Sequence, residues 1–587
     1  MKSFAIFSPI LGLREDVPSI LMKEAYTPDC QDVIWQDGEV HRIRKRLLEF
    51  TYQFPDKILN LEYYLKPSTD EWWFLIFTKR DIAYRDIVND RFVFINKLYT
   101  TGTITIEATN LKKVTGTGTA FSTNTKAGDF FKIGAEAVHT DSTWYEVDSV
   151  ESDTVLYLKT DATAVTDSAY VIRQTFSGSD FDYWSVIVFH EKLLATNRGV
   201  DNIVIWEGPN VSPYQVSDLA CSYKTTFLYS YNERVLLLRT IEGGDEKPFR
   251  IRWSGLGNEA DWAEPPTSDS GSMEVNEGDG VLQGAATYRG NLIIFKTFAM
   301  VRVWNVESEM VFNKSLLFDI GTNAPDSIFE MEDGIYFYGG DNTFRFFDGL
   351  VPRVISSEIE HITKNINPNF EQYIQVTFIE ELNQILWAIA EANSEINNKV
   401  LIYDLNFARN NWGVENMEVA SLGYYETEAA YDWSSMSMFV NWLDWWWPSW
   451  KYRAGLAAFP IDVIGSYDGK VYRLNGSEKD VGEDYTGYQV LETDLGGGKR
   501  LSIFDRLLLI QAYIRQEAAG TLDFHIKRDD EPNFQSAGSV NLAGDREILI
   551  RELSVDFLAK TFKIKISGQT PFKFLGCILK YEPVGER

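Results

Sequence analysis

The sequence has few cysteines, no long apolar run and a deficit of positive charge. Its three cysteines, Cys30, Cys221 and Cys577, lie far apart and form no C-x-x-C pair, which excludes a disulfide framework and gives no zinc or redox motif. No stretch reaches the roughly 18 apolar residues of a membrane span, so we expect none. Pro9 interrupts the apolar opening and no A-x-A site follows it, so we expect no secretory signal.

Positive charge is outnumbered, with 56 Lys and Arg against 85 Asp and Glu and a net charge of −29. Such a balance excludes a protein that grips nucleic acid over a wide face. The 5 histidines form no metal-ligand pattern, and no phosphate loop or nucleophile elbow is present. We therefore expect no enzymatic activity, catalytic residue, cofactor or metal. Paired carboxylates for glycoside hydrolysis stay open as the enzymatic alternative, because they can come from distant positions.

The residues that are abundant indicate an all-β protein. Hydrophobic residues make up 44% and aromatics 14% of the chain, in short Val, Ile, Tyr, Phe and Trp runs broken by Gly, Asn and Asp. Helical spacing is rare; the best case is 353–366, where isoleucines recur at 355, 359, 362 and 366. A two-strand unit repeats, and its copies start at Glu71, Lys192, Arg234, Asn291, Gly334, Gln384 and Pro460.

The spacing of this repeat predicts a β-propeller of six to eight blades. Four of the six intervals are close to the roughly 40–50 residues of a propeller blade. The other two fit once the Gly- and Thr-rich segment 106–175 and the Trp-rich insertion 424–455 are removed. A propeller leaves only short, protected sheet edges. A series of unrelated β-sandwiches is the alternative.

These patterns divide the chain into five parts. We expect an N-terminal segment at 1–50 that shares a platform with the C-terminus, and the start of the propeller at 51–105. Residues 106–175 form an inserted small β-barrel or sandwich module, 176–484 carry the remaining blades, and 485–587 form a C-terminal β-sandwich-like domain.

A basic cluster, HRIRKR at 41–46, stands out against the acidic chain. As a continuous strand it places Arg42, Arg44 and Arg46 on one face. They are interface candidates for acidic groups on a neighbouring chain. The other interpretation is a solvated edge strand that discourages aggregation.

The most unusual segment is FVNWLDWWWPSW at 439–450. It contains five tryptophans, at positions Trp442, Trp445, Trp446, Trp447 and Trp450. So many indoles near a proline predict packing against another domain or subunit, or presentation to an external target such as a membrane interface or a sugar.

Three stretches together resemble the tail nozzle, or lower tail-tube, protein of short-tailed bacteriophages. They are the opening SPILGLREDVPSILMKEAYTPDCQDVIWQDGEVHRIRKR, the insert GTGTAFSTNTKAGDFFKIG with YEVDSVESDTVLYL, and the end FDRLLLIQAYIR with FKIKISGQTPFKFLGCILKYEPVGER. The insert is similar to a β module of phage structural proteins, and the end to the closing domain of such proteins.

The resemblance implies a structural virion protein made in the host cytoplasm and located in the phage tail. In that family six copies form a ring, so it implies a homohexamer that binds adaptor and tail spike or fibre proteins. Genomic DNA would pass through the ring without stable binding, which the acidic balance fits. The alternative function is a secreted β-propeller that binds or hydrolyses carbohydrate.

Overall fold

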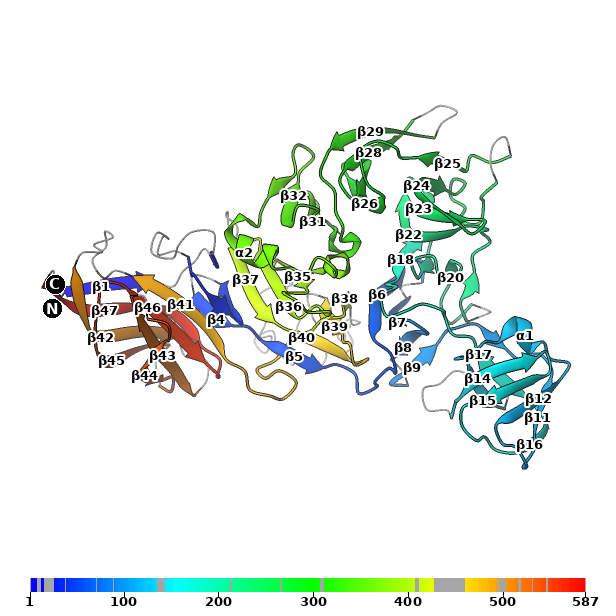
Figure 1. Cartoon of the computed structure of the whole chain (residues 1–587), viewed down its shortest axis with the longest axis horizontal. Coiled ribbons are helices and arrows are strands. Elements are labelled where there is room, and N and C mark those ends of the chain that lie inside the picture. Colours follow the sequence, from blue (N-terminus) through cyan, green and yellow to red (C-terminus); the bar gives the residue numbers. More distant parts are fainter. Residues whose placement is uncertain are drawn as a thin grey trace, which may run out of the picture.

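Strands form nearly all of the regular structure in the computed structural model of the chain (Figure 1). It describes all residues except 1, 8–11, 15–25, 37–38, 70, 88, 135–142, 212–213, 264–266, 307–310, 407–410, 427–459, 494, 496–502, 516–518, 530, 545–546 and 586–587. The helices in this part are short: α1 (Phe121–Asn124), η2 (Pro325–Ser327), η3 (Ser357–Ile359), α2 (Glu360–Lys364) and η4 (Glu371–Tyr373). None of the helices described is long and apolar enough to cross a membrane.

Seven four-stranded antiparallel sheets follow one another along the described chain. Blade 1 is β6 (Ile58–Lys66), β7 (Glu71–Thr78), β8 (Ile82–Asp86) and β9 (Arg91–Phe94), and blade 2 is β18 (Ser185–Phe189), β19 (Lys192–Thr196), β20 (Val204–Trp206) and β21 (Ser217–Asp218). Blade 3 is β22 (Lys224–Tyr231), β23 (Arg234–Glu242), β24 (Asp245–Trp253) and β25 (Gly271–Glu274), and blade 4 is β26 (Leu282–Tyr288), β27 (Asn291–Lys296), β28 (Met300–Asn305) and β29 (Phe312–Phe318). Blade 5 is β30 (Phe329–Glu330), β31 (Ile335–Gly339), β32 (Thr343–Phe347) and β33 (Arg353–Val354), and blade 6 is β34 (Gln375–Ile379), β35 (Gln384–Ile389), β36 (Lys399–Asp404) and β37 (Asn411–Asn416).

Hydrophobic clusters between neighbouring sheets close these blades into a ring. Tyr64 of blade 1 packs with Trp206 of blade 2, and similar clusters join each following pair up to blades 6 and 7. Phe74 of blade 1 packs with Val463 of blade 7 and completes the circle. The predicted propeller is thus confirmed, and its blade count among the described residues is seven.

Blade 7 takes its outer strand from the N-terminal part of the chain. It consists of β38 (Ser421–Tyr425), β39 (Ile461–Gly465), β40 (Val471–Ser477) and β5 (Lys45–Leu48). Leu48 pairs with Tyr472, and the Glu49 N–H donates to the Val471 carbonyl at 3.0 Å. Because β5 leads directly into blade 1, this pairing holds the ring closed.

The inserted module lies between blades 1 and 2 and starts at Leu98, earlier than the expected 106. Its eight strands form one strongly curled sheet: β10 (Leu98–Tyr99), β11 (Thr103–Ile106), β12 (Lys113–Thr117), β13 (Phe130–Ile133), β14 (Tyr145–Ser152), β15 (Val155–Leu158), β16 (Val165–Ser168) and β17 (Tyr170–Arg173). It has its own hydrophobic core around Phe121 and Tyr170.

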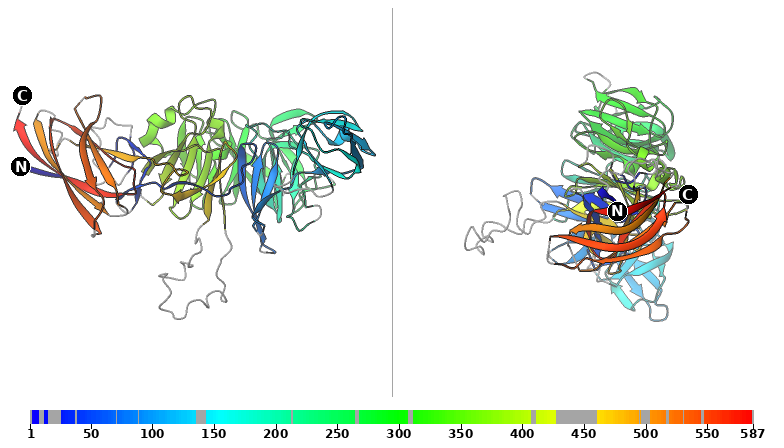
Figure 2. Two further views of the ribbon diagram at one scale, coloured as in Figure 1. Left: turned by 90° about the horizontal axis from the view of Figure 1, so that it is seen from below. Right: turned by 90° about the vertical axis from the view of Figure 1, so that its left-hand side faces the viewer.

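Two facing sheets form the C-terminal sandwich. One contains β1 (Lys2–Phe7), β3 (Val33–Gln36), β4 (Glu39–Arg42), β42 (Phe504–Arg515), β45 (Ile548–Ala559) and β47 (Lys573–Gly585); the other contains β2 (Cys30–Gln31), β41 (Gly487–Thr493), β43 (Thr521–Arg528), β44 (Gln535–Asn541) and β46 (Phe562–Gly568). Ile510 and Phe524 pack between the sheets. Figure 2 shows the sandwich, the propeller and the inserted module in a row along the long axis.

Candidate functional site at the propeller axis

Side chains from most of the ring meet on one face of the propeller, at its axis. The chain reaches this face in the connections that precede each first strand and in the turns between second and third strands. We call the group the axial cluster; it comprises Lys57, Phe181, Tyr183, Arg198, Asp326, Tyr373, Gln375 and Tyr467. Blade 2 supplies Arg198, while Asp326 precedes blade 5 and Gln375 begins blade 6. Blades so far apart in a ring of seven touch only across its axis.

Aromatic rings form the walls of the axial cluster. Tyr183 and Tyr373 stack with centroids 5.6 Å apart, and Phe181 lies 5.4 Å from Tyr373. The Lys57 ammonium lies 4.5 Å from the Tyr183 ring and 4.9 Å from that of Tyr467, within the range of cation–π attraction. Phe181 is 49% exposed, so this wall faces solvent.

An ion pair crosses the axis beside these rings. Arg198 Nη2 donates to Asp326 Oδ2 at 2.6 Å, and Gln375 Nε2 reaches the same oxygen at 3.2 Å. The Arg198 guanidinium also lies 4.5 Å above the Phe227 ring. The second nitrogen of this guanidinium, Nη1, has no hydrogen-bond partner among the described residues.

The Tyr183 hydroxyl is a second buried group without a partner. Tyr183 is only 2% exposed, and its oxygen makes no hydrogen bond within the described chain. Nearly all buried polar groups in folded proteins are hydrogen-bonded, so two such groups in one cluster call for an explanation. A bound polar molecule that accepts from Arg198 and contacts Tyr183 provides one.

Burial shifts the titration of two charged groups here. It lowers the pKa of Lys57 to about 8, although the charge of Asp180 opposes the shift. Burial also raises the pKa of Asp326, and the opposing effects of Arg198 and Gln375 do not cancel it. The cluster therefore holds a carboxyl group that gains a proton more readily than an exposed one.

Backbone contacts fix the aromatic walls in place. Asn397 donates through its side chain to the Tyr373 carbonyl at 2.8 Å, and its own N–H donates to the Tyr467 hydroxyl at 2.8 Å. The Lys57 ammonium donates to the Asp180 carbonyl at 3.0 Å. The rings are thus positioned before any ligand arrives.

The predicted arginine face is wrong. Residues 43–44 lie between β4 and β5 and belong to neither, so Arg42, Arg44 and Arg46 do not share one continuous strand. Arg42 is buried and binds the carbonyls of Tyr485, Glu478 and Gln569, while Arg44 is exposed and pairs with Glu478 at 2.8 Å.

Arg46 pairs with Asp480 at 2.8 Å. The three arginines therefore bind residues of the connection between β40 and β41, which links the propeller to the sandwich in the same chain. Their contact with a second chain stays a prediction. The tryptophan candidates Trp442, Trp445, Trp446, Trp447 and Trp450 lie outside the described residues.

Sequence reasoning missed the axial cluster. Its members are spread from Lys57 to Tyr467 and form no motif. The sequence could have indicated them only by their position, since several of them directly precede the first strand of a blade. No group of three or more His, Cys, Asp or Glu that could hold a metal ion occurs among the described residues.

The chain is similar to several solved structures of β-rich enzymes, while no family pattern and no curated protein sequence matches it. An exo-β-1,3-galactanase from Phanerochaete chrysosporium is 9% identical over 82% of this chain and 95% of its own, with a TM-score of 0.17. A glycoside hydrolase is 12% identical over 67% of this chain and 96% of its own, with a TM-score of 0.21. The phage phi92 endosialidase is 10% identical over 70% of this chain and 68% of its own, with a TM-score of 0.20.

The expectation of a protein without enzymatic activity was wrong, because glycoside hydrolases and an endosialidase are among the structures to which the chain is similar. At these TM-scores no residue correspondence follows, and no activity is transferred. None of the three names a tail nozzle protein, so that resemblance stays a prediction.

Proposed function

We propose that this protein is a carbohydrate-active β-propeller that binds a saccharide at the axial cluster. The observation that carries the proposal is the pair of buried groups without partners, the Tyr183 hydroxyl and Arg198 Nη1, between aromatic walls. A sugar ring is apolar on its faces and carries hydroxyls at its edge. It stacks on Phe181 or Tyr373 while its hydroxyls bind Tyr183 and Arg198.

Asp326 is the group that can donate a proton to a glycosidic oxygen. General acid catalysis requires a carboxyl group whose pKa lies above its ordinary value, and burial raises the pKa of Asp326 in that direction. Arg198 and Gln375 hold its Oδ2 atom and fix the direction of the carboxyl group. In this proposal Asp326 donates its proton to the departing glycosidic oxygen, a water molecule adds to the anomeric carbon and releases a proton to solvent, and the aromatic walls position the sugar.

The test uses the full chain on an array of neutral and acidic oligosaccharides, followed by calorimetry on the series that binds. Tyr183→Phe removes a hydroxyl with no partner in the described structure, so we expect an unchanged or raised melting temperature and about fivefold weaker sugar binding. Asp326→Asn should retain binding and lose release of reducing ends. Tyr157→Phe, on the exposed face of the inserted module, is the matched control.

The opposite results would count against the axial cluster. If the wild-type chain binds no saccharide, the proposal is wrong. It is also wrong if Tyr183→Phe and Tyr157→Phe affect binding equally, since only the first lies in the cluster.

A different observation favours a second function, a ring-forming tail component. β45 is twelve residues long and ends its sheet among the described strands. Ile548 and Ile550 project from its outer side and are 42% and 49% exposed. A long apolar edge strand readily pairs with another chain. We propose this edge as the contact through which copies of the chain assemble, with adaptor and spike or fibre proteins as further partners.

Mass photometry of the purified chain tests this second proposal. Rings should appear for the wild type and be lost in the Ile548→Lys, Ile550→Lys double variant, while Val584→Lys, at another exposed position of the sandwich, should still assemble. A wild-type chain that stays monomeric at all concentrations would contradict it.

A further inference from the structure

We infer that the site is extended: a neutral saccharide chain runs from the axial cluster into the cleft between blade 1 and the inserted module. This inference rests on the proposed carbohydrate function and adds the length and charge of the ligand. The cleft encloses about 540 Å³, and its walls include Gln53, Arg80, Phe130, Trp144, Glu146 and Asp468.

The cleft and the axial cluster adjoin each other along the chain at two points. Residues 53–55 line the cleft, and Lys57 of the cluster follows two residues later. Tyr467 belongs to the cluster, and its neighbour Asp468 lines the cleft. The side chain of Gln53 also donates to the Asp468 carbonyl at 2.7 Å, so the two points at which the regions adjoin are themselves in contact.

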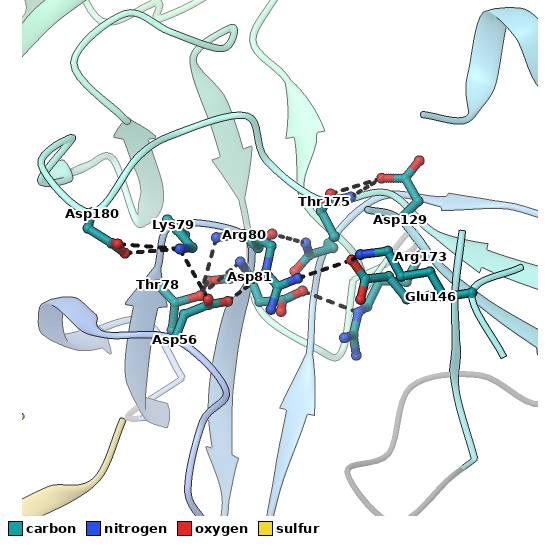
Figure 3. A network of polar contacts seen from close by, with 12 residues as sticks. Asp56, Thr78, Lys79, Arg80, Asp81, Asp129, Glu146, Arg173, Thr175 and Asp180 are labelled. Atoms are coloured by element: carbon teal, nitrogen blue, oxygen red, sulfur yellow. Dashed lines mark hydrogen bonds and ion pairs between the residues drawn. The ribbon is translucent and has the colours of Figure 1, made fainter. Parts of the chain in front are cut away.

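Between them runs a line of ion pairs (Figure 3), which we take as the floor of the extended site. The Lys79 ammonium lies 3.1 Å from the Asp180 carboxylate and 3.5 Å from that of Asp56. The backbone carbonyl of Asp180 accepts a hydrogen bond from Lys57. Arg80 continues the line, at 2.6 Å from Asp56 and 3.8 Å from Glu146 of the inserted module. A ligand that leaves the axis along this floor meets hydrogen-bonding groups at each step.

The far end of the cleft carries the aromatic surface that a sugar ring needs. Trp144 and Phe130 come from the inserted module and are partly exposed. The guanidinium of Arg173 is packed against both, 4.9 Å from the Trp144 ring and 4.6 Å from the Phe130 ring. Aromatic rings held in one position lose little entropy when a ligand stacks on them.

Arg173 also fixes the module against blade 1. It is 3% exposed, lies 3.8 Å from the Phe94 ring of blade 1 and pairs with Asp81 at 3.2 Å. Its Nη1 atom has no hydrogen-bond partner among the described residues. Arg173 therefore joins the two walls of the cleft directly.

The charges of the cleft select a neutral ligand. Arg80 and Arg173 are each already paired with carboxylates, at Asp56 and Asp81. Glu146 and Asp468 of the lining are paired as well, with Lys159 at 2.7 Å and Lys470 at 3.0 Å. An acidic saccharide would find the cations of the lining already paired, whereas hydroxyl groups bind both guanidinium and carboxylate groups.

The test compares ligand lengths. In the neutral oligosaccharide series that binds the wild-type chain on the array, calorimetry on disaccharide and octasaccharide should show about tenfold tighter binding of the octasaccharide. Trp144→Ala should remove this difference and leave the disaccharide affinity unchanged, which also shows that the axial cluster is folded. Gln53→Ala on the opposite wall should reduce the difference, and Phe298→Ala, at an exposed aromatic of blade 4, should leave it intact.

Length-independent binding overturns the inference while the proposed function stands. An equal loss of affinity for the disaccharide and the octasaccharide in Trp144→Ala overturns it as well, and so does preferential binding of acidic saccharides. Absence of any saccharide binding overturns both.

Discussion

Lys45 and Arg173 are both almost completely buried, yet their pKa values move in opposite directions. Burial lowers the pKa of Lys45, but Glu415 and Asp32, at 2.9 and 2.6 Å, outweigh it and the pKa is raised. Burial also lowers the pKa of Arg173, and Asp81 does not compensate. Two adjacent carboxylates stabilise the charge of Lys45, whereas one stabilises that of Arg173, and this difference accounts for the opposite pKa shifts.

Removal of Asp81, the one carboxylate that pairs with Arg173 among the described residues, should be costly. Asp81→Asn leaves a buried guanidinium without its counter-charge, so we expect a loss of about 3 kcal/mol in the free energy of unfolding. Arg173→Met added to Asp81→Asn should recover part of it. Thermal and urea denaturation measure both, and Asp556→Asn, which breaks the exposed pair with Arg506, should change nothing measurable. Equal effects of Asp81→Asn and Asp556→Asn would contradict the prediction.

Lys57 should make stability depend on alkaline pH. Its pKa is about 8 in the folded chain against 10.5 when unfolded, so the unfolded state binds more protons between these values. Stability from this residue therefore rises with pH from 8 to 10.5, by about 3 kcal/mol. Lys57→Met should be more stable than wild type at pH 7 and lack this rise. Parallel denaturation profiles for wild type and Lys57→Met would disprove it, and the exposed Lys364→Met is the control.

Among the elements, the innermost strands of blades 7 and 1 pack so closely that Gly423 leaves no room for a side chain. A Cβ atom on Gly423 of β38 would lie 2.6 Å from Leu61 Cβ of β6. This glycine lets the last blade reach the first. The outer strand β5 and this inner contact together close the ring.

Gly423→Ala should therefore destabilise the propeller by about 1–3 kcal/mol, because the added methyl meets an atom that cannot move aside. Gly413→Ala of β37 is the matched control, since its nearest neighbour is at 3.5 Å. Hydrogen exchange of blades 1 and 7 measures the effect. Equal protection in both variants would show that the closure tolerates the methyl.

Sequence reasoning predicts the blades well because each repeat is local. Each of the seven starts read from the sequence, from Glu71 to Pro460, falls at or next to the second strand of a blade. The four isoleucines of 353–366 are buried as their spacing predicts, but the α-helix spans only Glu360–Lys364. Local pattern determines burial, while tertiary contacts determine helix length.

Long-range contacts explain what the sequence does not predict. The residues of β5 look like an isolated basic strand, and their partner Tyr472 follows more than four hundred residues later. The axial cluster is similar, because Arg198 and Asp326 meet only after the ring has formed. Neither pairing leaves a periodic or local motif.

At the scale of the whole molecule, the inserted module is joined to the propeller by two short connections. The Gln174 N–H donates to the Lys97 carbonyl at 2.9 Å, so the two connections are neighbours. The module has a separate core, and Arg173 is its main charged contact with blade 1.

Replacement of 98–173 by a short Gly-Ser linker should leave the propeller folded. The deletion alone should lower the melting temperature, because Asp81 loses the counter-charge of Arg173. Asp81→Asn in the chain without the module should restore most of the lost melting temperature. Differential scanning calorimetry and circular dichroism check this, and loss of all β-sheet signal in both chains would show that the module is part of the propeller core.

The outer strand of blade 7, β5, is synthesised long before the strand with which it pairs, β40. Lys45–Leu48 leave the ribosome early, but β40 emerges more than four hundred residues later. At 5–20 residues per second the strand waits roughly 20 to 90 seconds for its partner. Thr27, whose hydroxyl binds the Val490 carbonyl across 463 residues, waits as long. The growing chain therefore carries an unpaired β5 until β40 has been synthesised. Slow codons between blades 6 and 7 would lengthen the exposure of β5 to chaperones and to other nascent chains.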